Sequence, residues 1–231
     1  FTRVVKLFTK LLNDTTEDGF VYRVDLRLRP WGDSGPVALH HLALEHYYQL
    51  HGREWEQYAM VKARIITGSD SDRTFIKSII KPFVYRKYHD YRVFEGLAGL
   101  KDQIDHQARS KNMHDNIKVG NGGIREIEFF VQAFQILKGG RNNKLQSQQI
   151  FVCFDILQSQ NIIPQRTIEE LREAYIFLRQ LENKIQMIAD EQSHSCPQNK
   201  LLRRRIAYTL GLEDWPSVQK RLNGHRAKVS Y

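Results

Sequence analysis

The sequence has little of what defines several large classes of protein. Its 231 residues include two cysteines, too few for a disulfide scaffold, and only 14 glycines and 6 prolines, too few for a collagen-like or low-complexity chain. No apolar run approaches the roughly 18 to 20 residues that span a bilayer, and no secretory signal pattern begins the chain. We therefore expect a globular protein of the reducing cytoplasm, with no membrane partner.

What the sequence does contain is an excess of positive charge. The 35 Lys and Arg residues outnumber the 26 Asp and Glu residues, which gives a net charge of +9. Such an excess attracts anions over long range, and a nucleotide phosphate, a nucleic acid or an acidic protein would each satisfy it. A solvated basic surface explains it equally well. The first residue is Phe1 rather than Met, so we expect the chain to be part of a longer protein.

Two periodicities divide the chain. Apolar and polar residues alternate from Phe20 to Leu28, which predicts a β-strand with one buried face that ends at Pro30. From His40 onward the apolar residues recur at the helical spacing, so the predicted fold class is α+β and predominantly α. The predicted helices are residues 4–12, 40–50, 54–66, 71–88, 91–110, 124 onward, 167–190, 201–210 and a last one from 214, with Ser71, Thr167 and Asp214 as N-caps.

A boundary near residues 67–72 separates the segment with the predicted strand from the helical remainder. A single strand or hairpin with its helices cannot close a sheet and bury its own core. We therefore expect the first segment to be the C-terminal part of a domain whose other strands lie upstream. The predicted domains are residues 1–68 and 69–231.

The polar face of the predicted strand is the first candidate site. Because Arg23, Asp25, Arg27 and Arg29 alternate with apolar residues, all four project to one side. A carboxylate on a strand is a rigid metal ligand, and the planar fork of arginine suits phosphate oxygens. The pattern indicates a nucleotide or phosphate site. A solvent-facing strand with ordinary surface ion pairs is the open alternative.

The second candidate site is a glycine-rich turn that opens directly onto a helix. A turn such as the one at Gly122 and Gly123 exposes backbone amides at a positive helix end, which suits phosphate. It lacks the GKS or GKT ending of a P-loop. On the helix, Arg125, Glu128 and Gln132 lie at spacings of three and four, so they form either an internal network or one wall of a ligand site.

Two other polar clusters are more typical of solvent-exposed helix surfaces than of metal or ligand sites. The histidines at positions 40, 41, 46 and 51 fit a polar helix surface better than a zinc site, because zinc needs converging ligands. The arginines at positions 203–205 fit a solvated helix face better than a nucleic-acid patch. We therefore expect no nucleic-acid partner.

Four separated motifs occur in order along the chain. They are Arg23-Val-Asp-Leu-Arg-Leu-Arg-Pro30, Gly32-Asp-Ser-Gly-Pro36, Trp55-Glu-Gln-Tyr-Ala-Met-Val-Lys-Ala-Arg64 and Gly122-Gly-Ile-Arg-Glu-Ile-Glu-Phe129. Together they resemble the bifunctional glutamine synthetase adenylyltransferase and adenylyl-removing enzyme, also called glutamate-ammonia ligase adenylyltransferase. The resemblance spans nearly the whole chain. It implies the C-terminal part of a DNA polymerase beta-like nucleotidyltransferase domain, followed by a helical bundle domain.

The glycine-rich motif distinguishes the two homologous halves of that family. With Arg125 and Glu126 it resembles the adenylyl-removing half, whereas the adenylylating half has Thr-Asp at the corresponding positions. The resemblance thus implies Mg²⁺-dependent phosphorolysis, in which phosphate attacks the adenylylated tyrosine of glutamine synthetase and ADP is formed. The alternatives are the adenylylating half, which uses ATP and releases pyrophosphate, and a noncatalytic docking module for glutamine synthetase or for the PII protein that controls the family.

The resemblance also implies roles for the candidate residues. Asp25 matches the third of three aspartates that hold Mg²⁺ in the family, whereas the preceding Asp-x-Asp pair is absent and Asp70-Ser-Asp72 lies downstream. We therefore expect the isolated chain to bind metal weakly. The other expected roles rest on charge and placement rather than on the resemblance. They are phosphate contacts from Arg27 and Arg29, charge neutralisation by Lys118 and by Arg125 close to the Asp25 face, and nucleotide binding that involves Arg23, Gly122, Gly123 and Glu128.

Overall fold

The computed structural model describes residues 1–19, 21–85, 115–188 and 193–230. They belong to two compact units, Phe1–Arg86 and Lys87–Tyr231, and each is described here by itself. The helix predicted at residues 91–110 lies outside the described residues. The predicted boundary between functional domains, at residues 68 and 69, stays a prediction.

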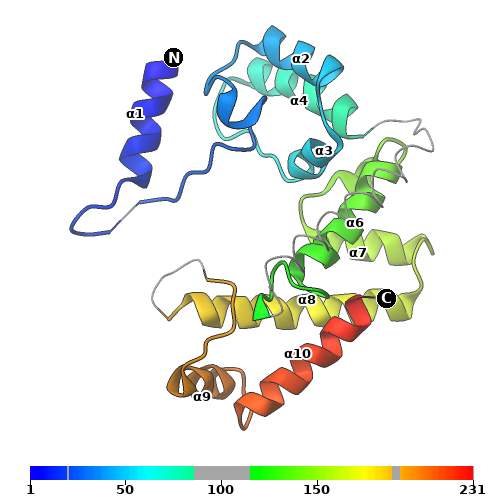
Figure 1. Cartoon of the computed structure of the whole chain (residues 1–231). Coiled ribbons are helices and arrows are strands. Elements are labelled where there is room, and N and C mark those ends of the chain that lie inside the picture. Colours follow the sequence, from blue (N-terminus) through cyan, green and yellow to red (C-terminus); the bar gives the residue numbers. More distant parts are fainter. Residues whose placement is uncertain (20, 86–114, 189–192, 231) are drawn as a thin grey trace. The chain divides into compact units, whose positions relative to one another are not determined.

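Three helices form a small core in the first unit. Helix α4 (Asp70–Val84) packs against α2 (His41–Leu50) and α3 (Glu54–Val61), as Figure 1 shows. The backbone amide of Asp72 donates to Ser69 Oγ at 3.2 Å, so Ser69 rather than the predicted Ser71 is the N-cap of α4. The buried apolar side chains of this unit are Tyr47, Tyr48, Tyr58, Val61, Ile79, Phe83 and Val84.

The first helix of the unit is strongly amphipathic but has no buried residue. Helix α1 (Thr2–Asn13) confirms the helix predicted at residues 4–12. Its apolar residues Val4, Leu7, Phe8 and Leu11 lie at helical spacing on one face, and all four are exposed. The apolar face of α1 is therefore open.

The predicted β-strand is wrong for this structure. The backbone from Tyr22 to Leu26 has no regular structure, and the nearest bridge is an isolated one between Thr16 and Gly19. An alternating segment becomes a strand only when a neighbouring strand exchanges backbone hydrogen bonds with it, and the regular elements described in this unit are helices. The described residues form nine α-helices and no strand, so the α+β class is corrected to all-α, while the prediction of a mainly helical chain is confirmed.

A long central helix organises the second unit. Helix α8 (Gln165–Gln186) contacts α6 (Ile124–Gly139), α7 (Ile150–Ser159), α9 (Lys200–Thr209) and α10 (Trp215–Val229), as Figure 1 shows. Their apolar faces meet in one continuous core. Its fully enclosed side chains include Ile117, Ile124, Ile127, Leu145, Phe154, Leu157, Ile168, Leu178 and Leu181.

The observed ends of the helices confirm one of the predicted N-caps and contradict another. Asp214 accepts a hydrogen bond from the amide of Ser217 at 2.9 Å and caps α10 as predicted. Helix α8 begins at Gln165, so Thr167 lies inside its first turn and the predicted cap there is wrong. None of the helices in the described residues is both long and apolar enough to cross a membrane.

Candidate functional site

Asp25 and Arg27 form a close ion pair in the first unit. Nη2 of Arg27 lies 2.6 Å from Oδ2 of Asp25, and Nε of Arg27 lies 3.0 Å from Oδ1. The backbone amide of Arg27 donates to the same carboxylate at 2.9 Å. Both side chains are largely exposed, so solvent screens the pair and it adds little to stability.

These hydrogen bonds change the acidity of Asp25. The side chain of Arg27, and then its backbone amide, lower the pKa of Asp25 from 3.8 to about 2. Asp25 is therefore ionised at any physiological pH, as a metal ligand must be. Because Arg27 already engages both carboxylate oxygens, its guanidinium has to move before a cation can take the same positions.

Arg29 fixes the loop that follows. Its guanidinium donates to the backbone carbonyls of Leu26 at 2.7 Å, Gly35 at 3.0 Å and Asp33 at 3.0 Å. With Nε, Nη1 and Nη2 all donating to carbonyls, the side chain has a structural role here. Arg23 is exposed on the same segment. Phosphate contacts from Arg29 and Arg23 stay predictions.

The described residues do not complete a metal site around Asp25. They contain no group of three His, Cys, Asp or Glu side chains that could hold one ion together. Mg²⁺ takes octahedral oxygen ligands, commonly one or two carboxylates with waters and substrate phosphates. Asp72 accepts from Ser69 at the start of α4, so the downstream Asp-x-Asp sequence is part of a helix cap. Asp25 thus offers a single carboxylate, and Mg²⁺ stays a prediction.

A buried carboxylate that the sequence reading missed organises the core of the first unit. Glu56 is fully enclosed, and its Oε1 and Oε2 accept hydrogen bonds from Tyr47 Oη and from the amide of Arg53, both at 2.8 Å. Tyr47 in turn packs edge-on against Trp31, with ring centroids 4.5 Å apart. The motif from Trp55 onward therefore contributes to the core. The position of Glu56 three residues after Arg53, as in a capping box, is the signal that could have shown this.

In the second unit, the backbone amides of the glycine-rich turn donate within the protein. The amide of Gly122 donates to Glu126 Oε2 at 2.8 Å, and that of Arg125 donates to the carbonyl of Lys118 at 2.9 Å. The amide of Gly123 donates to the carbonyl of Gly120 at 2.9 Å. These donors are not directed at a bound anion in this arrangement. The predicted nucleotide contacts of Gly122 and Gly123 stay predictions.

The two glycines allow a close approach of backbones. Gly122 has a φ of +67°, and a Cβ there would lie 2.4 Å from the carbonyl oxygen of Arg226 in α10. A Cβ on Gly123 would lie 2.7 Å from the carbonyl oxygen of Gly120. The turn therefore needs glycine for packing against α10 and for its own closure.

The polar stripe on α6 is partly an internal network. Tyr175 Oη donates to Glu128 Oε1 at 3.0 Å, which ties α8 to α6. The guanidinium carbon of Arg125 lies 5.9 Å from the centroid of the Phe129 ring, and no described carboxylate pairs with it. Gln132 is buried, and its Oε1 has no partner among the described residues. The predicted contact between Arg125 and the Asp25 face would join the two units and stays a prediction.

A second buried carboxylate, also missed from the sequence, lies near Lys118. Glu182 forms an ion pair with Arg179 and lies 3.0 Å from Nδ1 of His194. Burial lowers the pKa of His194, and the positive charge of Lys118 lowers it further. Lys118 is therefore close enough to act on this cluster. The three-residue spacing of Arg179 and Glu182 on one helix is the signal that could have shown the pair.

Comparisons with known families match successive parts of the chain. Residues 1–77 match glutamate-ammonia ligase adenylyltransferase, and residues 98–231, more than half of the chain, match GlnD PII-uridylyltransferase. The boundary between the compact units, at Arg86, falls between the two matches. The family predicted from the motifs is thus confirmed for residues 1–77. The chain belongs to the GlnD PII-uridylyltransferase family, and its first 77 residues relate it to the glutamate-ammonia ligase adenylyltransferases, which are nucleotidyltransferases of nitrogen regulation.

Proposed function

We propose that the chain is part of an adenylyl-removing domain that acts on adenylylated glutamine synthetase. The single observation behind the choice of half is the Arg125-Glu126 pair, which resembles the removing half rather than the Thr-Asp pair of the adenylylating half. Glu126 reaches back to the amide of Gly122 at 2.8 Å. An aspartate side chain is one methylene shorter than glutamate. With aspartate at position 126, the turn would need a different shape to keep the hydrogen bond from the Gly122 amide.

Two cations near the glycine-rich turn support a phosphate-binding role for this part of the second unit. Arg125 and Lys118 are both half-buried, and neither forms an ion pair with a described carboxylate. In phosphorolysis an inorganic phosphate oxygen attacks the adenylyl phosphorus, the bond to the tyrosine oxygen breaks, and ADP leaves. Two phosphate groups must approach each other in that reaction, so nearby positive charge lowers its barrier.

Magnesium dependence is part of the proposal. Bound Mg²⁺ would stabilise the charge that develops on the phosphoryl oxygens. Asp25, ionised and near the surface, is proposed as one ligand of a site that further carboxylates of the whole enzyme complete. Within the chain, Arg27 holds the Asp25 carboxylate in place and is proposed to turn toward phosphate when the metal binds.

A second candidate function is docking. The match of residues 98–231 to a family named for PII uridylylation supports binding of the PII protein by the second unit. In this alternative the chain binds glutamine synthetase or PII without contributing to turnover. The adenylylating activity is the third possibility, and the Arg125-Glu126 pair argues against it.

The test uses the whole enzyme of which we propose this chain to be a part. It is incubated with adenylylated glutamine synthetase, phosphate and Mg²⁺, and the nucleotide products are separated. We expect ADP that requires phosphate, its loss in Asp25→Asn, and about a hundredfold lower rate in Arg125→Gln. Lys138→Gln, which changes an exposed cation at the other end of α6, is the matched control.

Each other product pattern selects another function. Pyrophosphate formed from ATP and unmodified glutamine synthetase, without phosphate-dependent ADP, would show the adenylylating half. Binding without either product would show the docking module. A normal rate in Arg125→Gln would remove that residue from the site.

A further inference from the structure

The positive charge of the chain is concentrated near its last two described helices. Between Lys200 and Lys228 there are eight Lys and Arg residues and two acidic residues, a net charge of +6 out of +9 for the whole chain. Helices α9 and α10 hold all eight of these cations and pack against each other. An eighth of the chain therefore has two thirds of its net charge.

The three consecutive arginines of α9 divide into two roles. Arg203 donates to the carbonyl of Pro197 at 2.7 Å and to Gln198 Oε1 at 2.8 Å, and its guanidinium carbon lies 5.4 Å from the centroid of the Trp215 ring. It is therefore structural. Arg204 and Arg205 are exposed, and neither has an ion-pair partner among the described residues.

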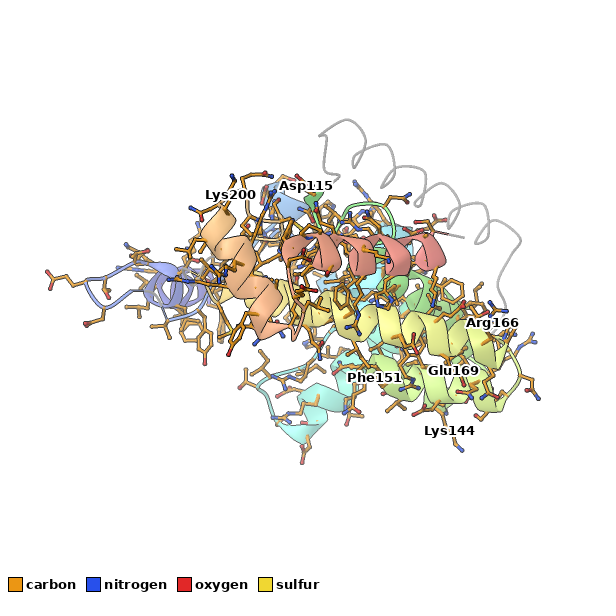
Figure 2. All side chains as sticks on the ribbon, turned by 90° about the horizontal axis from the view of Figure 1, so that it is seen from below. Asp115, Lys144, Phe151, Arg166, Glu169 and Lys200 are labelled. Carbon is orange, nitrogen blue, oxygen red and sulfur yellow. The ribbon has the colours of Figure 1, made fainter. Side chains whose placement is uncertain are left out.

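Two exposed apolar side chains lie beside these arginines. Leu201 is 56% exposed and Tyr208 is 83% exposed. Positions 201, 204, 205 and 208 follow the i, i+3, i+4, i+7 spacing of one helix face, while Ile206 and Ala207 on the other side are buried. We call this exposed face, Leu201, Arg204, Arg205 and Tyr208, the α9 surface. Figure 2 labels Lys200 at the start of this helix.

We propose that the α9 surface docks an acidic region of glutamine synthetase, and this inference rests on the proposed function. Arginine and tyrosine are among the residue types that contribute most at protein interfaces, and the exposed Leu201 on the same face supplies apolar area. Within the described residues the guanidiniums of Arg204 and Arg205 have no ion-pair partner, and they favour a carboxylate-rich surface because carboxylates bind arginine in a bidentate way. A nucleic acid is contacted mainly through its phosphates, whereas this face combines two arginines with two exposed apolar side chains and so fits a protein surface better.

The proposal is tested by binding, without phosphate or nucleotide, so that the result does not depend on turnover. Adenylylated glutamine synthetase is immobilised, and the affinity of the chain is measured at low and at moderate salt. We expect R204E/R205E to weaken binding at least about tenfold and to remove most of its salt dependence, and Tyr208→Ala to weaken it about fivefold. Circular dichroism and thermal unfolding should be unchanged, since these exposed side chains form no hydrogen bond or ion pair with a described residue.

The matched control makes the same change in charge elsewhere in the same unit. K138E/K144E alters two exposed lysines on α6 and just after it, and Figure 2 labels Lys144 far from Lys200. We expect its affinity to stay within about twofold of the original. An equal loss in both double variants would show a general charge effect and overturn the proposal, as would unchanged binding in R204E/R205E.

Two further measurements distinguish a nucleic-acid site from a failure of the proposed phosphorolysis. If a 20-base-pair DNA duplex binds more tightly than glutamine synthetase and loses its affinity in R204E/R205E, the surface is a nucleic-acid site and the proposal is wrong. If the whole enzyme forms no ADP while R204E/R205E still weakens binding to glutamine synthetase at least about tenfold, the proposed phosphorolysis fails and the docking surface stands.

Discussion

Both compact units contain amphipathic helices with a similar apolar pattern, but the apolar face is buried in one unit and exposed in the other. In the second unit, α8 places Leu178 and Leu181 in a core where neither is exposed to solvent. In the first unit, α1 has an equally regular apolar face, and its Phe8 is 60% exposed. Periodicity therefore reports which face of an element can be buried, and a partner element decides whether it is.

The units also differ in how they use buried charge. The first builds a small aromatic core around Glu56, which Tyr47 and Arg53 satisfy. The second builds a large aliphatic core and keeps Glu182, with Arg179 and His194, at its margin. A small core loses a larger share of its stability with one polar network, so the first unit should be the more sensitive to such a loss.

The largest effect should come from one chemical change made in both units. Phe154→Ala removes a fully enclosed ring of the second unit, and we expect it to lower the free energy of unfolding by about 3–5 kcal/mol. Phe8→Ala on the open face of α1 should change it by about 0.5 kcal/mol or less. Denaturant titration of both variants checks this. Equal losses would mean that the face of α1 is covered.

The next effect concerns two glycines of the second unit. Gly122→Ala forces an alanine into a left-handed backbone and against the carbonyl of Arg226, which should cost about 3 kcal/mol. Gly224→Ala, inside α10 with no atom within 4 Å of a Cβ, should stabilise the unit by about 0.5–1 kcal/mol. Thermal unfolding should therefore move in opposite directions. A stable Gly122→Ala variant would show that the turn can separate from α10.

A smaller effect, confined to the first unit, should follow the loss of its buried carboxylate. Glu56→Ala leaves the hydroxyl of Tyr47 and the amide of Arg53 without their acceptor, at a cost of about 2 kcal/mol. Hydrogen exchange should become faster in α2 and α3 and stay unchanged in α8. Faster exchange in α8 as well would show that the two units unfold together.

The comparison also shows what could be predicted from sequence. Helical spacing located most helices of both units because side chains three and four apart share a face whatever they pack against. The strand prediction is wrong for the described residues 21–28 because strand formation depends on a neighbouring strand, which is not a property of the segment itself. For the candidate site, the spacing of Glu128 left an internal network and a ligand-site wall open, and its partner Tyr175 lies 47 residues away, where no local pattern identifies it. The metal-ligand role of Asp25 rests on the family resemblance, and the role of Arg125 rests on its charge and its place beside the glycine-rich turn.

The smallest expected effect is a difference in acid sensitivity between the units. Burial lowers the pKa of His225 below its ordinary value of 6.5, and the charges of Arg221 and Lys228 lower it further, while Glu173 opposes them. Because the folded state then binds fewer protons than the unfolded state, this histidine makes the second unit less stable as the pH falls below about 6.5. Asp25, with a pKa of about 2, keeps its charge over the same range, so its ion pair in the first unit should persist.

Urea titrations at pH 7.5 and 5.5 measure that difference. We expect His225→Gln to reduce the loss of stability at pH 5.5, since glutamine takes up no proton in this range while it can still pack beside Phe177. His194, whose pKa burial also lowers, should account for part of the loss that remains. His46→Gln, at an exposed position of α2, should leave the pH dependence of the second unit as it was. If His225→Gln keeps the full acid loss, protonation of this ring is not its cause, and the acid sensitivity would have to come from the His194 and Glu182 pair.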